Sequence, residues 1–188
     1  MSGGSSVLLD PFIIDMLFDE GKSILDVGCG KGKWGYLVRT SCKPCNLIIG
    51  VDIDREHLEY VKKHKIYDII LCDARRLPLK SATFDIVLAI DVIELLDRKG
   101  AYYLIAECER VAREKIVIAT PNRSRLNIHT KWTAKDLKKW GFIVRGVGFS
   151  PLGAPVSHRL IFGLAVLGYL LPDLSYVLLA WKRLKISK

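Results

Sequence analysis

The sequence predicts a doubly wound α/β fold, in which helices cover both faces of a mostly parallel sheet, and three observations support it. Short apolar runs alternate with longer segments of helical period along most of the chain. The run at residues 86–90 is apolar throughout, as expected of a parallel strand that is covered on both faces. The first apolar run, at residues 23–27, ends in a cluster of glycines that suits a tight turn from a strand into a helix.

Helices and strands are expected to alternate along the chain up to residue 119. Helices are expected at residues 8–18, 34–39, 56–63 and 101–112. Strands are expected at residues 23–27, 47–51, 66–71, 84–90 and 115–119. A turn-rich stretch through Pro78 separates the third strand from the fourth. Strands that are separated mainly by helices predict βαβ units, and therefore a sheet that is parallel at its centre.

A further helix and strand are expected beyond Pro121. Thr133 is a suitable N-cap for a helix over residues 133–140, and Gly141 is a suitable residue to end it. Residues 142–147 are rich in apolar and β-branched side chains, so they predict another strand.

The last part of the chain is very apolar. Residues 151–173 are interpreted as an apolar helical insertion, buried or lying on the surface, before a last strand at residues 176–181. Pro172 and Asp173 interrupt the apolar stretch, which argues against a membrane-spanning helix. Peripheral contact with a membrane stays open as an alternative. We expect residues 1–188 to form a single domain.

Charge and composition narrow the partners only slightly. The formal net charge is +9, but the basic residues are spread along the chain rather than gathered in one tail. Nucleic acid is a possible partner that we do not favour, because most aromatic residues stand inside apolar runs where core packing explains them. Glutamine is absent and lysine, arginine and glutamate are plentiful, which indicates a thermophilic source.

The cysteines indicate a reducing environment. The chain has five of them, an odd number, and shows no signal peptide, so a cytoplasmic location is expected. Cys42 and Cys45 form a single CxxC pair, which supplies two of the four ligands of a structural zinc, and so no metal is expected. A local disulfide between these cysteines and two free thiols in a turn around Pro44 both stay open.

The strongest functional signal is the segment at residues 24–35, where a strand leads into a glycine-rich turn and then into a helix. Glycines allow the backbone to approach a ligand closely. About twenty residues further on, the second strand ends at Asp52, whose carboxylate can accept hydrogen bonds from both hydroxyls of a ribose. The pattern indicates a nucleoside site, and the GxGxxG spacing of residues 30–35 keeps a dinucleotide open as an alternative.

Four motifs together resemble the class I S-adenosylmethionine-dependent methyltransferases, over roughly residues 8–150. Residues 26–30, Asp52, residues 72–74 and residues 84–94 stand in the order in which that family has its first four motifs. The resemblance implies a Rossmann-like methyltransferase fold with seven strands, the last of them antiparallel. It also implies S-adenosylmethionine as the methyl donor and S-adenosylhomocysteine as the product.

The resemblance places the donor against residues of these motifs. They are Asp26, Gly28, Cys29, Gly30, Gly32, Asp52, Ile53, Asp73, Ala74 and Asp91. A donor with a positive sulfonium and an ammonium group suits a site that is rimmed by carboxylates. The pyrophosphate of a dinucleotide would instead face Asp26 and Asp91, which is unfavourable, so an NAD-dependent oxidoreductase is the least favoured alternative.

Methyl transfer is an in-line displacement from an activated donor, so positioning supplies much of the acceleration and a general base assists some acceptors. The candidates for proton transfer are Asp91, Glu94 and His129. His129 stands in a segment that resembles the acceptor-facing stretch of small-molecule members of the family, although a histidine on a surface loop is an equal alternative. Leu95 occupies a place where the family often has histidine, which weakens a transferred catalytic role for Glu94.

The acceptor is expected to be a small molecule. Its candidate binding residues are Asn122, Arg123, Arg125 and His129. Guanidinium groups at this position could bind a carboxylate or a phosphate of the acceptor, and solvated loop charges are the alternative. A lipid, isoprenoid or RNA acceptor and a non-catalytic donor-binding scaffold are the competing hypotheses, and the protein could be a monomer or a homodimer.

Overall fold

The computed structural model describes residues 9–17, 21–40, 47–122, 129–148 and 169–184. In chain order the elements are α1 (Asp10–Leu17), β1 (Ser23–Val27), α2 (Lys33–Thr40), β2 (Leu47–Asp52), α3 (Arg55–Lys63), β3 (Asp68–Leu71), β4 (Phe84–Ile90), η2 (Ile93–Leu95), α4 (Arg98–Val111), β5 (Ala112–Pro121), α5 (Ala134–Lys139), β6 (Ile143–Val147), η3 (Pro172–Leu174) and β7 (Val177–Arg183). Within these ranges no helix combines the length and the hydropathy that crossing a membrane would require.

The strands form one seven-stranded sheet in the order β3-β2-β1-β4-β5-β7-β6. Neighbouring strands from β3 to β5 are parallel, and β7 is antiparallel to both β5 and β6. The strand order reverses between β1 and β4, which is the switch point at which doubly wound folds bind ligands. The expected α/β architecture, with its antiparallel last strand, is confirmed.

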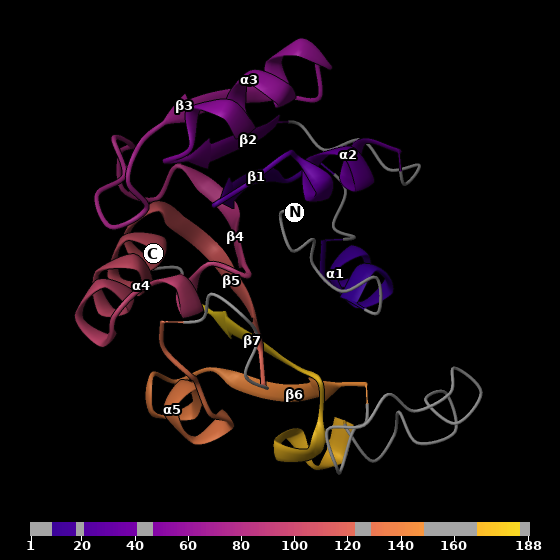
Figure 1. The fold of residues 1–188 in the computed structure, drawn as a ribbon, viewed down its shortest axis with the longest axis vertical. Helices are drawn as coiled ribbons and strands as arrows, with labels where there is room; N and C mark the ends of the chain where they lie inside the picture. Colours follow the sequence, from indigo (N-terminus) through magenta and orange to yellow (C-terminus); the bar gives the residue numbers. More distant parts are fainter. Residues whose placement is uncertain (1–8, 18–20, 41–46, 123–128, 149–168, 185–188) are drawn as a thin grey trace.

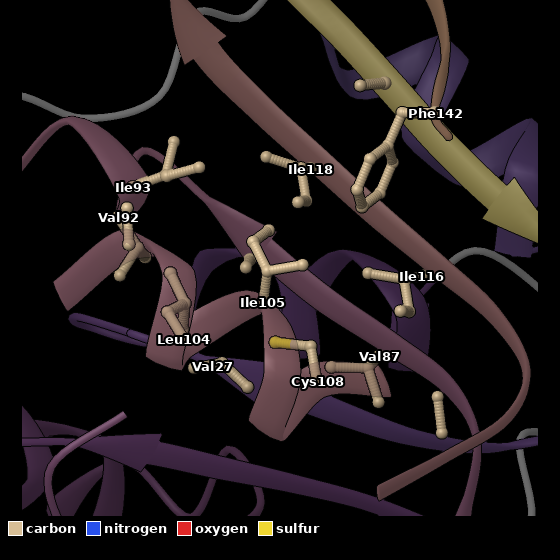
Figure 2. Close-up of a cluster of buried hydrophobic side chains, with 14 of the residues drawn as sticks. Val27, Val87, Val92, Ile93, Leu104, Ile105, Cys108, Ile116, Ile118 and Phe142 are labelled. Atoms are coloured by element: carbon tan, nitrogen blue, oxygen red, sulfur yellow. The ribbon is translucent and has the colours of Figure 1, made fainter. Parts of the chain in front are cut away.

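The two faces of the sheet carry two separate hydrophobic cores. Alternate residues of one strand serve opposite faces, so Val87 lies in one core while Ile86 and Leu88 lie in the other. The first core joins the sheet to α4 and α5, and Figure 2 shows Leu104, Ile105 and other side chains of α4 directed at the strands. The second core includes residues of α1, α2 and α3. Figure 1 shows α4 and α1 on opposite sides of the sheet, as the doubly wound prediction requires.

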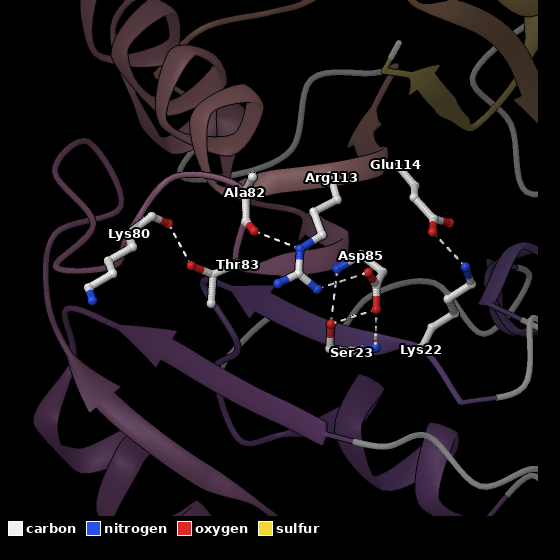
Figure 3. A network of polar contacts seen from close by, with 8 residues as sticks. All are labelled: Lys22, Ser23, Lys80, Ala82, Thr83, Asp85, Arg113 and Glu114. Atoms are coloured by element: carbon white, nitrogen blue, oxygen red, sulfur yellow. Dashed lines mark hydrogen bonds and ion pairs between the residues drawn. The ribbon is translucent and has the colours of Figure 1, made fainter. Parts of the chain in front are cut away.

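A polar network ties together the strand ends at the edge of the sheet opposite the glycine-rich turn (Figure 3). The Ser23 hydroxyl donates to Asp85 Oδ2 at 2.7 Å, and the Asp85 backbone N–H donates back to the Ser23 hydroxyl at 3.0 Å. Arg113 Nη1 lies 3.3 Å from Asp85 Oδ1, and Lys22 Nζ lies 2.6 Å from Glu114 Oε1. The starts of β1, β4 and β5 are therefore held in register by side chains as well as by the ladder.

Some element boundaries differ from the prediction, and backbone hydrogen bonds explain them. The strand predicted from Ile66 begins at Asp68, because the Ile66 N–H donates to the Val61 carbonyl and so closes α3. The helix predicted from residue 101 begins at Arg98, because Asp97 caps it by accepting a hydrogen bond from a backbone N–H.

The last helix before β6 is capped as predicted. The Thr133 hydroxyl and the Asp136 carboxylate form a reciprocal capping box at the start of α5.

Other predictions fall partly or wholly outside the described residues. Cys42 and Cys45 lie there, as does most of the predicted insertion at 151–173, of which only residues 169–173 are described.

Candidate functional site

The ends of four adjacent parallel strands meet at one edge of the sheet. Strands β3, β2, β1 and β4 are neighbours and all point the same way, so the segments that follow them converge at their carboxyl ends. The four motifs of the sequence lie in these segments. The fold therefore brings together residues that are separated by more than sixty positions in the chain.

The glycine-rich turn presents its backbone toward Asp52. Gly28 has a φ of +68° and its N–H donates to the Val51 carbonyl at 2.8 Å. Gly30 has a φ of +52° and its N–H donates to Asp52 Oδ2 at 2.8 Å. A Cβ placed on Gly30 would meet no atom within 4 Å, so the backbone borders open space at this point. Such a turn lets a ligand approach the main chain closely.

The Asp52 carboxylate keeps acceptor capacity for a ligand. Oδ1 accepts a hydrogen bond from the Asp54 N–H at 2.9 Å, and Oδ2 accepts the one from Gly30. A carboxylate has about four acceptor sites, so about two remain, which matches the two hydroxyls of a ribose. His57 Nδ1 lies 3.8 Å from Asp52 Oδ2, and the neighbouring Ile53 is 69% exposed.

Asp26 lies on β1, just before the glycine-rich turn. It is 1% exposed, and its Oδ2 accepts a hydrogen bond from the Tyr67 hydroxyl at 3.0 Å. Burial raises the pKa of Asp26 to about 7, the Tyr67 hydrogen bond lowers it, and the charge of Asp52 adds to the rise. Direct contact of Asp26 with the donor thus stays a prediction, and in this structure the carboxylate contacts Tyr67.

Tyr67 was not predicted from the sequence, although two glycines signal its position. A Cβ on Gly35 would come within 1.6 Å of the Tyr67 ring, and a Cβ on Gly50 within 2.2 Å. The ring therefore occupies a slot that only glycines leave open, between α2 and β2. This close packing places its hydroxyl on Asp26.

Asp73 and Ala74 follow β3, in the segment that the resemblance assigns to the adenine. The Asp73 carboxylate is bound by the guanidinium of Arg75, with Nη2 to Oδ2 at 2.6 Å. The Arg75 hydrogen bond holds the pKa of Asp73 below its usual value, against the opposing effect of burial. Ala74 is half-buried and packs against the core under α4.

Asp91 follows β4 in an unusual backbone conformation. Its φ is +56°, and its N–H donates to the Ala119 carbonyl at 2.9 Å. A residue other than glycine rarely adopts a positive φ, and such strain concentrates at functional sites. This observation singles out Asp91 among the candidate carboxylates.

Glu94 has contacts typical of a structural residue. It is 4% exposed, and its Oε2 accepts a hydrogen bond from the Thr120 hydroxyl at 3.0 Å. Its backbone carbonyl accepts hydrogen bonds from the N–H groups of His129 at 2.9 Å and Thr130 at 3.1 Å. His129 is exposed. The fully buried Trp132 adds a bond from its indole N–H to the Ile93 carbonyl at 3.2 Å.

Of the remaining candidates for acceptor binding, the structure describes Asn122 but not the two arginines. The two N–H groups of the Asn122 side-chain amide lie within hydrogen-bond distance of three backbone carbonyls, so Asn122 ties the end of β5 to the chain before β7. These carbonyls belong to Pro172, Asp173 and Ser175. Its donors are thus engaged, and we leave it out of the proposed acceptor site. Arg123 and Arg125 lie outside the described residues.

The cysteines and acidic groups of the described residues form no metal site. No group of three or more histidine, cysteine, aspartate or glutamate side chains is placed to hold a metal ion in that part of the chain. Cys29, Cys72 and Cys108 are free thiols. Burial raises the pKa of Cys108 to about 12 and raises that of Cys29 as well, so neither is an activated nucleophile.

The class of protein follows from what stands at the strand ends, namely a glycine turn at the first strand and a carboxylate at each of the next three in the motif order. This is the arrangement of a doubly wound protein that binds a nucleoside-containing cofactor. A family model described as a methyltransferase domain matches residues 24–115. This match and the relatives described below support a class I S-adenosylmethionine-dependent methyltransferase, as the motif order predicted. S-adenosylmethionine is the cofactor of this family.

Individual relatives agree with this assignment. The chain is 29% identical over 105 residues to a "probable S-adenosylmethionine-dependent methyltransferase" of Mycobacterium tuberculosis, covering 54% of this chain and 36% of that protein. It is 32% identical over 100 residues to an O-methyltransferase of Pyrenophora dematioidea, covering 48% and 36%. The chain thus spans about a third of the length of these curated relatives.

A solved structure shows the same fold over nearly the whole chain. It is a S-adenosylmethionine-dependent methyltransferase from Archaeoglobus fulgidus, with a TM-score of 0.66 and 17% identity, covering 93% of this chain and 94% of that one. The residues present also fit the cofactor chemically. Asp52 retains acceptor capacity for ribose hydroxyls, and Gly30 leaves space where a side chain would stand.

Proposed function

We propose that this chain transfers a methyl group from S-adenosylmethionine to a small-molecule acceptor, as a single domain. The observation that carries the proposal is the Asp52 carboxylate beside the open backbone of Gly30, at the edge where β1 to β4 end together. The donor supplies a methyl group that is already activated by a sulfonium, so the protein needs mainly to bind and orient the two reactants.

In this proposal each motif holds one part of the donor. Asp52 accepts hydrogen bonds from the ribose hydroxyls, Asp73 accepts one from the adenine amino group, and the turn at residues 28–32 borders the methionine portion. Asp91 faces the positive groups of the donor, and its strained backbone supports a functional role for it. Asp26, together with Tyr67, supports the turn from below.

On the acceptor side we propose His129 as the group that receives a proton from the acceptor. It is exposed, and its backbone is fixed to Glu94 beside the end of β4. Histidine suits proton transfer near neutral pH. Glu94 holds this segment in place through Thr120 and takes no part in proton transfer. The name of the Pyrenophora dematioidea relative, an O-methyltransferase, supports an oxygen atom as the acceptor.

Donor binding is tested by isothermal titration with S-adenosylhomocysteine and, in parallel, with NADH. We expect the wild-type protein to bind S-adenosylhomocysteine and Asp52→Ala to weaken it by at least about tenfold, since two ligand hydrogen bonds to a charged group are lost. Asp68→Ala is the matched control, because Asp68 is an exposed carboxylate at the opposite end of β3. Binding of NADH with no binding of S-adenosylhomocysteine would refute the proposal.

Acceptor class is tested with donor labelled in its methyl group. The protein is incubated separately with small-molecule, lipid and RNA fractions of a cell extract, and label transfer is counted for wild type and His129→Ala. Transfer into the small-molecule fraction that falls by about 100-fold in His129→Ala supports both the acceptor class and the role of the histidine. Transfer into lipid or RNA alone would overturn the acceptor class, and transfer into no fraction would favour a donor-binding scaffold.

A further inference from the structure

The segment after β3 is fastened to the rest of the site at both of its ends. The Cys72 N–H donates to the Asp52 carbonyl at 3.0 Å, which ties the segment to the residue that faces the ribose. At the other end the Leu77 N–H donates to Glu107 Oε2 at 2.7 Å, and Arg110 donates to the Leu77 carbonyl at 3.0 Å. The backbone around Asp73 thus has a fixed position relative to Asp52.

Arg75 fixes the Asp73 carboxylate itself. Its backbone N–H donates to Oδ1 at 2.9 Å, its Nε–H lies 3.0 Å from each oxygen, and its Nη2 lies 2.6 Å from Oδ2. The stem of Arg75 lies against the first turn of α4, where a Cβ on Gly100 would come within 3.3 Å of the Arg75 Cδ. Backbone and guanidinium together leave the carboxylate one orientation.

This arrangement leaves room for one further donor. Three N–H groups of Arg75 fill about three of the four acceptor sites of the carboxylate. The guanidinium also keeps the pKa of Asp73 below its usual value, so the group is ionised near neutral pH and can only accept. An adenine 6-amino group can donate to it, whereas the 6-oxo group of hypoxanthine offers another acceptor.

We propose that Arg75 is a positioning residue that aims the Asp73 carboxylate at the 6-amino group of the adenine and so makes the site select adenine over hypoxanthine. The inference rests on the proposed function, because contact between Asp73 and the adenine is part of that proposal. Arg75 acts through Asp73, so its effect appears as a change of selectivity rather than as a loss of the site.

The test compares the dissociation constants of S-adenosylhomocysteine and S-inosylhomocysteine by isothermal titration. We expect the wild type to prefer the adenine ligand by about 100-fold, because a site built to accept from an amino group rejects an analogue that lacks it. Arg75→Gln should reduce this preference by about tenfold, mainly by weakening S-adenosylhomocysteine. Arg76→Gln is the matched control, since Arg76 is an exposed neighbour of equal charge, and its preference should stay within about twofold of wild type.

Asp73→Asn separates a positioning role from a general loss of structure. If Arg75 acts through Asp73, then adding Arg75→Gln to Asp73→Asn should change the preference by less than about twofold. Tighter binding of S-adenosylhomocysteine by Arg75→Gln, an unchanged preference, or equal effects of Arg75→Gln and Arg76→Gln would each overturn the inference. A wild type that binds no S-adenosylhomocysteine, or an Asp73→Asn variant identical to wild type, would overturn the proposed contact as well.

Discussion

Asp26 is a carboxyl group placed where its charge is costly, so replacing it with a neutral side chain has a calculable effect. It is 1% exposed, and the Tyr67 hydroxyl donates to it at 3.0 Å. Asp26→Asn keeps the size of the side chain and an oxygen that can accept from Tyr67, while it removes the ionisation. The variant therefore isolates the cost of burying the charge.

The size of the effect follows from the pKa of Asp26, which burial raises from 3.8 to about 7 in the folded protein. Between these two pH values the folded state binds more protons than the unfolded state, so stability contributed by this group falls as the pH rises. A rise of about three pKa units corresponds to about 4 kcal/mol. The free energy of unfolding of Asp26→Asn, relative to wild type, should thus rise by about 4 kcal/mol from pH 4 to pH 8.

Urea unfolding of the two proteins at several pH values measures this difference directly. All other ionisable groups are common to both, so the contributions of those that do not interact with Asp26 cancel, and Asp52, whose charge adds to the rise in the pKa of Asp26, is the coupled group. Asp68→Asn is the control, because Asp68 is exposed and should give a difference that is flat with pH within about 0.5 kcal/mol. A flat difference for Asp26→Asn would refute the reasoning, since it would mean that the buried carboxyl ionises as it does in water.

Three other variants test separate features of the fold by urea unfolding. Asp91→Ala should be about 1 kcal/mol less stable than Asp91→Asn, because asparagine tolerates the positive φ at this position better than alanine does; equal stabilities would mean that the backbone is not held there. Burial raises the pKa of Asp85, but hydrogen bonds from Ser23 and Arg113 outweigh this effect and lower the pKa below 3.8. Asp85→Asn should therefore cost about 1–2 kcal/mol of stability at pH 7, and progressively less as the pH falls below 3.8. A cost that is constant with pH would contradict this. Thr120→Val removes the hydroxyl donor of the buried Glu94 and should cost about 2 kcal/mol, which a near-neutral result would rule out.

The sheet could be predicted closely because its signals are local. The strands Ser23–Val27 and Phe84–Ile90 begin and end where predicted, since each is an apolar run bounded by turn residues. One error falls where a backbone N–H bonds to a neighbouring element, and β5 runs from Ala112 to Pro121 rather than over the predicted residues 115–119. The β-branched side chain of Ile66 predicts the start of a strand, but its backbone N–H donates to the Val61 carbonyl at the end of α3. Periodicity describes side chains and carries no information on such backbone pairs.

The candidate site also has a part that the sequence predicted and a part that it did not. The glycine turn and the aspartates at the carboxyl ends of β2, β3 and β4 were predicted, because each stands at the end of a strand or within two residues of it. The partners that hold them were missed when the contact joins distant residues. Tyr67 and Asp26 are 41 positions apart, Thr120 and Glu94 are 26 apart, and Trp132 and Ile93 are 39 apart. Arg75 is only two residues from Asp73, and it was missed because charge pairing on an exposed loop is not encoded by periodicity.

Asp26 and Asp52 show why a motif alone does not assign roles. Both are aspartates at or near the ends of neighbouring parallel strands, and both belong to motifs that the resemblance assigns to the donor. Their environments differ because the Tyr67 ring packs over Gly50 and covers Asp26, while Asp52 accepts only the backbone N–H groups of Gly30 and Asp54 and keeps acceptor sites to spare. Gly50 on β2 thus leaves the space in which the ring of Tyr67, just before β3, covers Asp26. Substrate contact is therefore better inferred from the groups that already occupy a carboxylate than from its place in a motif.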